Sequence, residues 1–511
     1  MRMRWKSRKT LTATTAVTLI AAGAALAGPG RAAEAAPGAA PGTQVSGTLA
    51  DGTTWIAEYP QAWNGTLLLY SHGFGPLTAA DAPDPATKAA LLADGYALAG
   101  SSYDPNNSDW ALDTAVSDQF NSLAAVESTV LPSRPAHVIA VGTSMGGLVS
   151  ALEAQQGAGR INGALTTCGI VGGGVNLNEY QIDGEYAIAQ LLGNPGTQLV
   201  GFGNATTALG TAAALTADAG AAQATAAGQA RLALAMAFLN VTPWDPSATA
   251  PAPASDPAAQ EKAEYDTLFG GSFSIMDFIE LGRVSVDQAD GGNATWDVGT
   301  NFARVLAHSP YKTQVAALYR KAGLNLHADL ATLTSHTSIT ADPAALRSLY
   351  QTSVPTGRLE VPELDLHTIG DNLVPVQNEN NYARLVERAG SGSLLRQAFT
   401  ESYGHCNFSS AELVAGVEAI MHRVTSGQWG NVATAASLEQ AAEATGLGQA
   451  HFANYYPGPL TGAVPSFKTA RRISLPRRGP GVAPGKLPGL SARRDGGSCH
   501  RALNPGRRLL G

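Results

Sequence analysis

The sequence predicts an α/β fold built around a mostly parallel β-sheet. From Thr53 onward, short strand-like runs alternate with longer segments of helical composition. The central runs, among them "TLLLYS" and "HVIAV", are apolar at consecutive positions, which is typical of strands buried on both faces. Strands separated by helices in this order favour a parallel sheet with helices packed on both sides.

The expected elements follow one another regularly along the chain. The predicted strands are "TTWIAEYP", "GTLLLYSHG", "GYALAGSSY", "HVIAVGTS", "GALTTCGIVGG", "LEVPELDLHTIGD" and "LLRQAFTESYGH". The predicted helices cover residues 81–93, 110–130, the segment after "GTS" to about 156, 377–387, and a segment that begins near Ser409. These elements define a core in two parts, residues 37–174 and 358–467, with a flexible lead-in at 37–50.

Residues 175–357 form an insertion of a different character. They include an Ala-rich helical stretch from Ala208 to Leu239 and a Pro-rich loop, "TPWDPSATAPAPASDP", with little strand signal. Long connections inside a compact sheet usually have their own structure and a function. We therefore expect a helical cap over the edge of the sheet where the strands end.

The two ends of the chain differ from the body. Residues 1–36 begin with basic residues, continue with the apolar run "LTATTAVTLIAAGAALA" and reach small-residue cleavage sites, which predicts a signal peptide and a secreted protein. A retained membrane anchor is the alternative, but Thr and Gly dilute the run. Residues 468–511 are basic, rich in Pro and Gly, and lack apolar periodicity, so we expect a disordered tail.

The formal net charge of −7 is an average over unlike parts. Of the 33 Lys and Arg residues, six precede residue 37 and eleven follow residue 467. Of the 40 acidic residues, only Glu34 and Asp495 lie in these two terminal segments. The remaining 16 basic and 38 acidic residues give the body a charge of about −22. This charge argues against nucleic acid as a partner, and no later apolar run favours stable membrane insertion. An uncharged or weakly charged substrate, a small molecule or a polymer, fits better; the oligomeric state is left open.

One serine lies between glycines where a predicted strand ends. Ser144 stands in "GTSMGG", a G-x-S-x-G pattern between the strand "HVIAV" and the helix "GLVSALEAQQ". Small residues at Gly142 and Gly146 allow the sharp turn that exposes a nucleophile at a helix N-terminus. The pattern also recurs by chance in a chain with 57 glycines, so it needs support from elsewhere.

A second strand end supplies backbone donors for an oxyanion. The strand "LLLYS" runs into His72-Gly73-Phe74-Gly75, at the same sheet edge as the serine. The backbone N–H groups of Phe74 and Met145 are therefore the candidates for an oxyanion hole. His72 comes too early in the chain for the base, and we expect it to hold this loop.

Two later strand ends supply an acid and a base. Asp371 follows the strand "LDLHTIG", and His405 follows "FTESYG". Asp371 is alternatively a turn-forming residue, and a lone loop histidine is often only a surface group. The other candidates for the acid, Glu363 and Asp365, lie inside the strand. We interpret His367, on the same strand, as a packed or hydrogen-bonded core group.

Together these segments resemble the α/β-hydrolase superfamily, because serine, acid and base arrive in that order, each at a strand end. The resemblance covers Thr53 to about Gly427 outside the insertion. It implies an α/β-hydrolase fold with a mostly parallel eight-stranded sheet and a large helical cap inserted after the sixth strand. It also implies a triad of Ser144, Asp371 and His405 and an oxyanion hole from Phe74 and Met145. The size of the insertion and the C-terminal extension depart from the family's pattern.

The three cysteines allow one disulfide. Cys168 ends the strand "ALTTC", Cys406 follows the proposed base, and Cys499 lies in the tail. A bridge between Cys168 and Cys406 would anchor the loop that carries His405. It would be similar to the disulfide that braces the triad residues in tannases and feruloyl esterases. Two free buried thiols are the alternative. No Cys-x-x-Cys or His/Cys cluster predicts a metal site, and the proposed chemistry needs no cofactor.

The resulting prediction is a secreted serine hydrolase of carboxylic esters that forms an acyl-enzyme. A secreted serine exopeptidase or amidase of the same fold is the alternative, with acidic residues of the insertion holding a free N-terminus; a non-catalytic binding protein is a third. The acidic candidates, which also fit a solvated helix face, are Glu261, Glu264, Asp266 and Glu280. The aromatic residues that fit either an apolar acyl group or the insertion's own core are Phe238, Trp244, Phe269 and Phe273.

Overall fold

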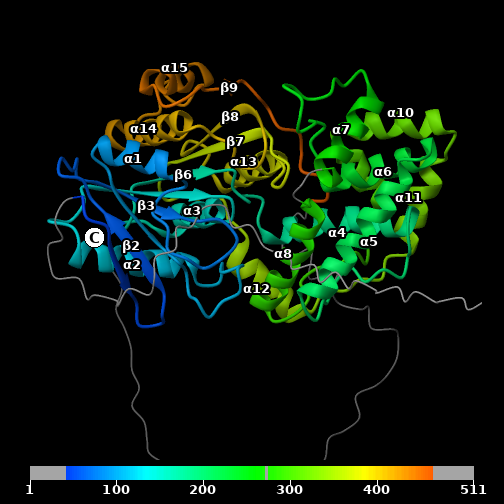
Figure 1. The fold of residues 1–511 in the computed structure, drawn as a ribbon, viewed down its shortest axis with the longest axis horizontal. Coiled ribbons are helices and arrows are strands. Elements are labelled where there is room, and N and C mark those ends of the chain that lie inside the picture. The colour runs from blue at the N-terminus through cyan, green and yellow to red at the C-terminus, as the bar shows by residue number, and fades with distance from the viewer. Residues whose placement is uncertain (1–41, 271–273, 464–511) are drawn as a thin grey trace, which may run out of the picture. The chain divides into compact units, whose positions relative to one another are not determined.

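The centre of the protein is a single twisted sheet, drawn in Figure 1. The computed structural model describes residues 42–270 and 274–463. Across the sheet the strand order is β1-β2-β4-β3-β5-β6-β7-β8-β9. The strands are β1 (Val45–Thr48), β2 (Thr54–Glu58), β3 (Thr66–Ser71), β4 (Ala97–Ser101), β5 (His137–Thr143), β6 (Gly163–Thr167), β7 (Glu363–Gly370), β8 (Leu395–Tyr403) and β9 (Phe452–Ala453).

The sheet is mixed, and within the described residues it has nine strands where eight were expected. All neighbours from β4 through β3, β5, β6 and β7 to β8 pair in parallel. At the edges, β1 pairs with β2, β2 with β4 and β9 with β8 in antiparallel fashion. Both β1 and the two-residue β9 are too short to give a recognisable period in the sequence, which explains the wrong strand number.

Helices cover both faces of this sheet. One face packs against α1 (Pro85–Ala93) and α14 (Ser410–Ser426), with α15 (Ala435–Thr445) outside them. The opposite face packs against α2 (Ala115–Thr129), α3 (Met145–Gln156) and α13 (Gln377–Ala389). Alternate residues of one strand serve the two layers, because successive side chains point to opposite faces. In β3, Leu68 and Tyr70 join the α14 side, and Leu67 and Leu69 join the α2 and α3 side.

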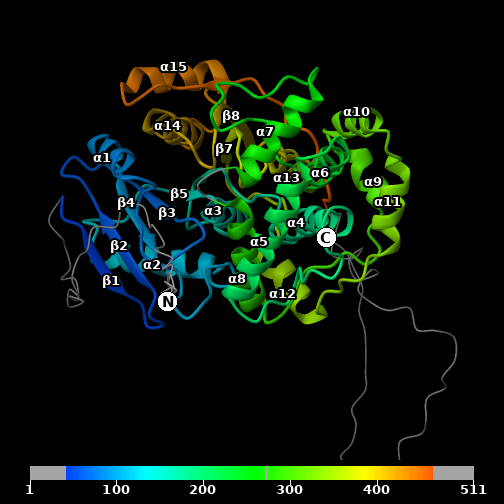
Figure 2. The same cartoon turned by 45° about the vertical axis from the view of Figure 1, so that its right-hand side comes forward.

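Within the described residues, the insertion between β6 and β7 consists of helices and connecting loops, without a strand. Its helices gather at the right of the sheet in Figure 1 and come forward in Figure 2. They are α4 (Gly174–Leu191), α5 (Ala205–Ala222), α6 (Ala226–Leu239), α7 (Pro257–Phe269), α8 (Ile275–Asp290), α9 (Phe302–His308), α10 (Lys312–Ala322), α11 (Leu326–Ser335) and α12 (Pro343–Ser353). A separate apolar core holds most of them together, centred on α4 and α6. The division of the chain into core and cap domains stays a prediction.

Three predicted helices differ in their limits. The Ala-rich stretch from Ala208 to Leu239 is two helices, because Thr225 caps α6 by accepting a hydrogen bond from the Gly228 amide. Helix α1 begins at Pro85 rather than near residue 81, since Asp84 caps it. Helix α2 begins at Ala115, so Trp110 lies in the preceding loop.

The predicted signal peptide at 1–36 and the basic tail at 468–511 lie outside the described residues. Within the described residues, none of the helices combines the length and the apolar character that crossing a membrane requires.

Candidate functional site

Ser144 lies on a sharp turn between β5 and α3. Its backbone has φ +61° and ψ −121°, a conformation that non-glycine residues rarely adopt and that costs free energy. The neighbouring glycines make room for the turn. A Cβ added at Gly142 would lie 1.9 Å from the carbonyl oxygen of Gly146, and one at Gly146 would lie 1.9 Å from that of Ser71. No side chain fits at either position, as expected from the sequence.

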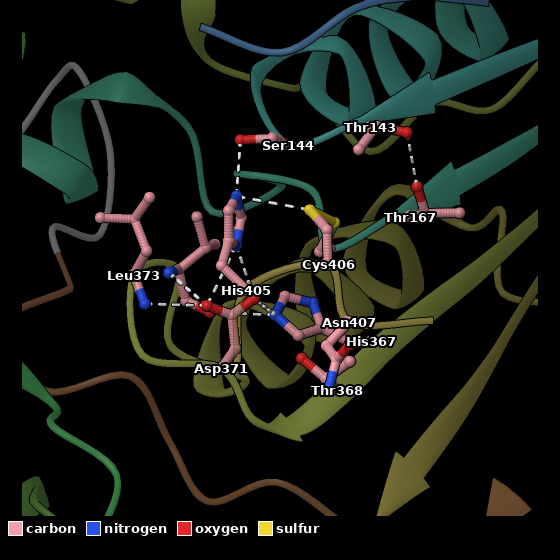
Figure 3. Close-up of a disulfide and its surroundings, with 12 residues drawn as sticks. Thr143, Ser144, Thr167, His367, Thr368, Asp371, Leu373, His405, Cys406 and Asn407 are labelled. Carbon is pink, nitrogen blue, oxygen red and sulfur yellow. Dashed lines mark hydrogen bonds and ion pairs between the residues drawn. A yellow bond between two sulfur atoms is a disulfide. The ribbon is translucent and has the colours of Figure 1, made fainter. Parts of the chain in front are cut away.

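His405 and Asp371 reach this serine from the loops after β8 and β7. Ser144 Oγ and His405 Nε2 are 2.8 Å apart, and His405 Nδ1 lies 2.8 Å from Asp371 Oδ2. Figure 3 shows the three side chains in contact. The structure therefore brings together the three residues that the sequence predicted as nucleophile, base and acid.

Asp371 is buried and held from several sides. Its Oδ1 accepts hydrogen bonds from the backbone amides of Leu373, at 2.9 Å, and Val374, at 2.8 Å. Burial alone would raise the pKa of this carboxyl, but the imidazoles of His405 and His367 outweigh burial and hold the pKa below its usual value. Asp371 is thus a carboxylate that can keep Nδ1 of His405 protonated and leave Nε2 facing the serine.

His367 is a second histidine against the same carboxylate. Its Nε2 lies 3.4 Å from Asp371 Oδ2 and 2.9 Å from the Val374 carbonyl oxygen, and its Nδ1 lies 2.9 Å from Glu379 Oε1. Both ring nitrogens therefore face acceptors, which favours a doubly protonated ring. Burial would lower the pKa of His367, but Asp371 and Glu379 raise it to about 10. The sequence predicted only a packed or hydrogen-bonded core histidine here.

The two other candidates for the acid, Glu363 and Asp365 on β7, have other partners. Glu363 accepts hydrogen bonds from Tyr382 and Thr166, at 2.8 and 3.2 Å. Burial and the charges of Glu363 and Glu379 raise the pKa of Asp365 well above its usual value. Neither group is bonded to His405.

A disulfide joins Cys168, at the end of β6, to Cys406, beside the histidine. Their Cα atoms are 5.3 Å apart across a sequence separation of 238 residues. The expected bridge is therefore confirmed, and the alternative of two free thiols is wrong. It ties the loop that carries His405 to the strand next to β5.

Phe74 and Met145 lie beside the serine. A Cβ added at Gly73 would come within 3.2 Å of Ser144 Cβ, so the loop that carries Phe74 passes directly over the nucleophile. Met145 is the first residue of α3, where backbone N–H groups have no carbonyl within their own helix. His72 is half-buried, stacks on Tyr103 with ring centroids 4.3 Å apart, and has its Nδ1 2.8 Å from the Gly73 carbonyl oxygen, so it holds the loop, as expected.

A pocket opens beside Ser144 between the sheet edge and the insertion. The residues that line it are Phe74, Trp110, Ser144, Ile170, Leu177, Asn178, Gln181, Phe278, Ile279, Gly282, Arg283, Val286, Leu373 and Val374. The insertion contributes α4 and α8, and the sheet side contributes the Phe74 loop and the segment after Asp371. Trp110, Asn178 and Phe278 were not predicted from the sequence. They belong to no motif, and only the folded chain brings them close to Ser144.

The acidic residues of the insertion that were candidates for holding a free N-terminus are bound to other side chains. Glu261 binds Gln223, Glu264 binds Gln314, Asp266 pairs with Lys262, and Glu280 lies 3.5 Å from Arg283. Among the described residues, none of these acids lines the serine pocket.

Of the aromatic candidates, Phe238 and Phe269 belong to the insertion's own core, and Trp244 is buried with its indole N–H bound to the Ala248 carbonyl. Phe273 lies outside the described residues. The aromatic walls of the pocket are Phe74, Trp110 and Phe278 instead.

In the described residues, the side chains close enough to share a metal ion are Cys168, His405 and Cys406. The two sulfurs are joined to each other, so neither is a thiolate ligand.

Comparison with known proteins finds an amidase. The chain is 28% identical over 428 residues to "o-phthalyl amidase" of Xanthobacter agilis, a match that covers 76% of this chain and 88% of the relative. No protein-family model matches. The similarity extends over most of both chains and supports a hydrolase of the esterase and amidase type.

Solved structures that resemble this one include esterases. Feruloyl esterase B from Aspergillus oryzae matches at 15% identity and a TM-score of 0.36, over 75% of this chain and 80% of that one. The rice cell wall degrading esterase LipA from Xanthomonas oryzae matches at 15% identity and a TM-score of 0.31, over 75% and 88%.

Proposed function

We propose that this protein is a serine hydrolase that cleaves carboxylic acid derivatives through an acyl-enzyme on Ser144. The observation that carries the proposal is the chain of contacts from Ser144 Oγ to His405 Nε2 and from His405 Nδ1 to Asp371, each 2.8 Å long at its closest. A hydroxyl in contact with an imidazole, itself oriented by a buried carboxylate, is the arrangement that activates a serine.

The reaction has two halves. His405 takes the proton of Ser144 as Oγ attacks the acyl carbonyl, while Asp371 holds the Nδ1–H of the ring and offsets its developing charge. The oxyanion receives hydrogen bonds from the backbone N–H groups of Phe74 and Met145. His405 then protonates the leaving alcohol or amine, and a water molecule repeats the steps on the acyl-enzyme to release the acid.

The pocket favours an aromatic acyl group. Phe74, Trp110 and Phe278 supply flat apolar walls, and Ile170, Leu177, Ile279 and Val286 fill the space between them. Aromatic faces and edges pack well against a planar ring. This lining supports an apolar or aromatic acyl group, although the residues that form it are not the aromatic candidates named from the sequence.

Amide hydrolysis is the second candidate, favoured by the similarity to the o-phthalyl amidase. The deciding measurement uses the 4-nitrophenyl ester and the 4-nitroanilide of one aromatic acid. Each kcat/KM is divided by the uncatalysed rate constant, because the ester is intrinsically more reactive. A larger ratio for the ester supports the ester prediction, and a larger ratio for the anilide replaces it with amide hydrolysis.

We also propose that the protein acts outside the cytoplasm. The basic and apolar pattern of residues 1–36 supports export, and a disulfide beside the site is expected to persist in an oxidising compartment. N-terminal sequencing of the protein recovered from its source should find a start between Ala27 and Ala36; an intact Met1 would refute cleavage.

The test of the catalytic assignment is Ser144→Ala. We expect kcat/KM to fall by about 10⁴-fold or more, with folding retained, because the nucleophile is lost and its surroundings are kept. Rates on a 4-nitrophenyl ester and thermal unfolding check this. Ser117→Ala, an exposed serine on α2, is the matched control.

A fluorophosphonate should add one label, on Ser144, as seen by mass spectrometry. Turnover by Ser144→Ala close to wild type, or a label elsewhere, would remove Ser144 from the reaction.

A further inference from the structure

The disulfide beside the site is in contact with the imidazole of His405 itself. Cys406 Sγ lies 3.4 Å from His405 Nε2, the nitrogen that faces Ser144 Oγ at 2.8 Å (Figure 3). Because Nδ1 of this ring is bound to Asp371, Nε2 is the nitrogen that can accept a proton. A sulfur atom and the serine hydroxyl therefore share one nitrogen of His405.

The chemical state of Cys406 decides what it does to this nitrogen. A disulfide sulfur carries no proton, so Cys406 does not compete with Ser144 for Nε2 while the bridge is closed. A free thiol at the same place loses its proton far more readily than a serine hydroxyl, and beside an imidazole it forms a thiolate–imidazolium pair. In that pair Nε2 is already protonated and cannot take the proton of Ser144.

The backbone at both ends of the bridge has a conformation that cysteine rarely adopts. The φ angles of Cys168 and Cys406 are +45° and +54°, in the left-handed region, where a side chain costs free energy. Opening the bridge lets either residue relax. Strained disulfides are reduced more easily than relaxed ones and are often the regulatory ones.

Cys406 is the more accessible end of the bridge, since it is half-buried, whereas Cys168 is fully buried at the end of β6. A thiolate of a dithiol attacks Cys406 Sγ, the Sγ–Sγ bond breaks, and Cys168 leaves as a thiolate. The second thiol of the reagent then displaces Cys406. Two electrons and two protons pass to the protein, and the dithiol becomes a cyclic disulfide. Closing the bridge reverses these steps, with another disulfide as the oxidant.

Three other ionisable side chains of the described structure act on Asp371. His367 lies 3.4 Å from its Oδ2 and stays a cation at neutral pH, because its pKa is raised to about 10. Burial and the charge of Asp371 raise the pKa of Tyr180 and of Tyr403, so both phenols stay neutral. Since these three groups keep their charge at neutral pH, the open and closed states differ in the sulfur of Cys406.

We propose that the Cys168–Cys406 bridge is a redox switch of the site: in the reduced protein the Cys406 thiolate holds His405 as an imidazolium and leaves Ser144 without a base, and closing the bridge releases the base. The inference rests on the proposed function, because it takes His405 as the base of Ser144. It adds a regulation to that function. The protein is inactive under reducing conditions and becomes active where disulfides form.

The test uses the full-length protein with Cys499→Ser as the parent, so that the two bridge cysteines are the only ones in the chain. Cys168→Gly leaves a free thiol at Cys406, and adding Cys406→Ala removes it; neither variant has the bridge. We expect kcat/KM for a 4-nitrophenyl ester near pH 7 to be at least about tenfold lower in the single variant than in the double. Equal rates would mean that the bridge only braces the loop.

The matched control is Cys406→Ala alone. It also lacks the bridge and keeps one free thiol, but that thiol is the buried one at Cys168, and the sulfur 3.4 Å from Nε2 is gone. It should turn over like the double variant. A rate as low as that of Cys168→Gly would assign the loss to any free thiol and remove Cys406 from the switch.

Blocking the thiol of Cys168→Gly should activate this variant. Methyl methanethiosulfonate converts Cys406 into a methyl disulfide, which has no proton to lose, and the glycine leaves room for the methylthio group where the Cys168 side chain was. We expect kcat/KM to rise to that of the double variant and to fall again when a dithiol removes the group. An unchanged or lower rate after blocking would overturn the switch.

Should Cys168→Gly fail to fold, the parent protein carries the same test. Reduced with dithiothreitol, it should have a kcat/KM at least about tenfold below that of Cys168→Ala with Cys406→Ala, and reoxidation should restore its rate. A reduced parent as active as that double variant would overturn the switch.

Failure of the proposed function has a separate signature. The ultraviolet absorbance of the thiolate is measured in Cys168→Gly with Ser144→Ala, which needs no turnover. The thiolate should persist at pH 7, well below the pKa of about 8.5 of an ordinary thiol, and His405→Gln should abolish it there. A Ser144→Ala protein that keeps its turnover removes the catalytic assignment even where the thiolate forms. Absence of the thiolate at pH 7, with Ser144→Ala inactive, removes only the switch.

Discussion

The most unusual single residue near the serine is His367, because it shares Asp371 with His405. Its ring lies between Asp371, Glu379 and the Val374 carbonyl oxygen, and its pKa is raised to about 10. A positive charge here stabilises the Asp371 carboxylate but also opposes a second positive charge on His405. In Figure 3 the two imidazole rings converge on Asp371.

His367→Gln should therefore change the pH dependence of catalysis. Without the imidazolium, one positive charge beside Asp371 is lost, and the acidic limb of the kcat/KM profile should move upward by roughly half to one pH unit. The measurement is kcat/KM for a 4-nitrophenyl ester between pH 4.5 and 9.

The double variant His367→Gln with Glu379→Gln is the charge-balanced control, since it also replaces the carboxylate that faces His367 Nδ1. It should show a smaller upward displacement than His367→Gln alone, because the loss of the Glu379 carboxylate partly cancels the loss of the imidazolium. An acidic limb that stays in place in both variants would mean that His367 only fills space.

At the scale of elements, the site depends on where parallel strands end. Strands β5, β7 and β8 run in the same direction, so Ser144, Asp371 and His405 reach one edge of the sheet although 261 residues separate serine and histidine. The sequence order of these strand ends was enough to predict the three residues. It was not enough to predict His367's role, since Glu379 comes from α13 and Val374 from the loop before that helix.

The Cys168–Cys406 bridge connects two of these elements, so its removal should affect both stability and rate. For Cys168→Ala with Cys406→Ala we expect about 3 to 5 kcal/mol less stability, because the bridge closes a loop of 238 residues. We also expect kcat to fall by about tenfold or more, since His405 loses its anchor. Chemical denaturation and ester turnover measure the two effects.

Cys499→Ser is the matched control for the bridge, because it removes the third cysteine and leaves Cys168 and Cys406 in place. Its unfolding and turnover should equal those of the wild type. A bridge-free protein that kept wild-type kcat would show that packing alone positions the histidine.

For the whole molecule, the notable property is the number of buried acids that retain protons. Burial raises the pKa of Glu261, Asp290 and Glu363 to about 7 and that of Asp287 and Asp297 to about 6. The folded state thus holds protons that the unfolded chain releases above about pH 4.

We therefore expect the protein to be more stable at pH 5 than at pH 8. The raised acids contribute stability that is present below pH 4 and is lost as the pH rises to about 7, and His367 adds a loss between about 6.5 and 10. Asp371 acts in the opposite sense, but only below pH 4, because its pKa is lowered. The free energy of unfolding at pH 5, 6.5 and 8 in denaturant measures the trend; a value that rose with pH would contradict it.

By itself the sequence determined the α/β class, the helical nature of the insertion and the candidates Ser144, Asp371, His405 and Cys406. Those features depend on local patterns. Apolar runs and their periods predict strands and helices, glycines permit the turn at Ser144, and a polar residue at a strand end marks a candidate for the site. Only the tertiary structure decided the ninth strand, the choice between a Cys168–Cys406 bridge and two free thiols, and the pocket of Trp110, Asn178 and Phe278. These depend on contacts between distant segments, where burial and charge are set by neighbours that no local pattern names.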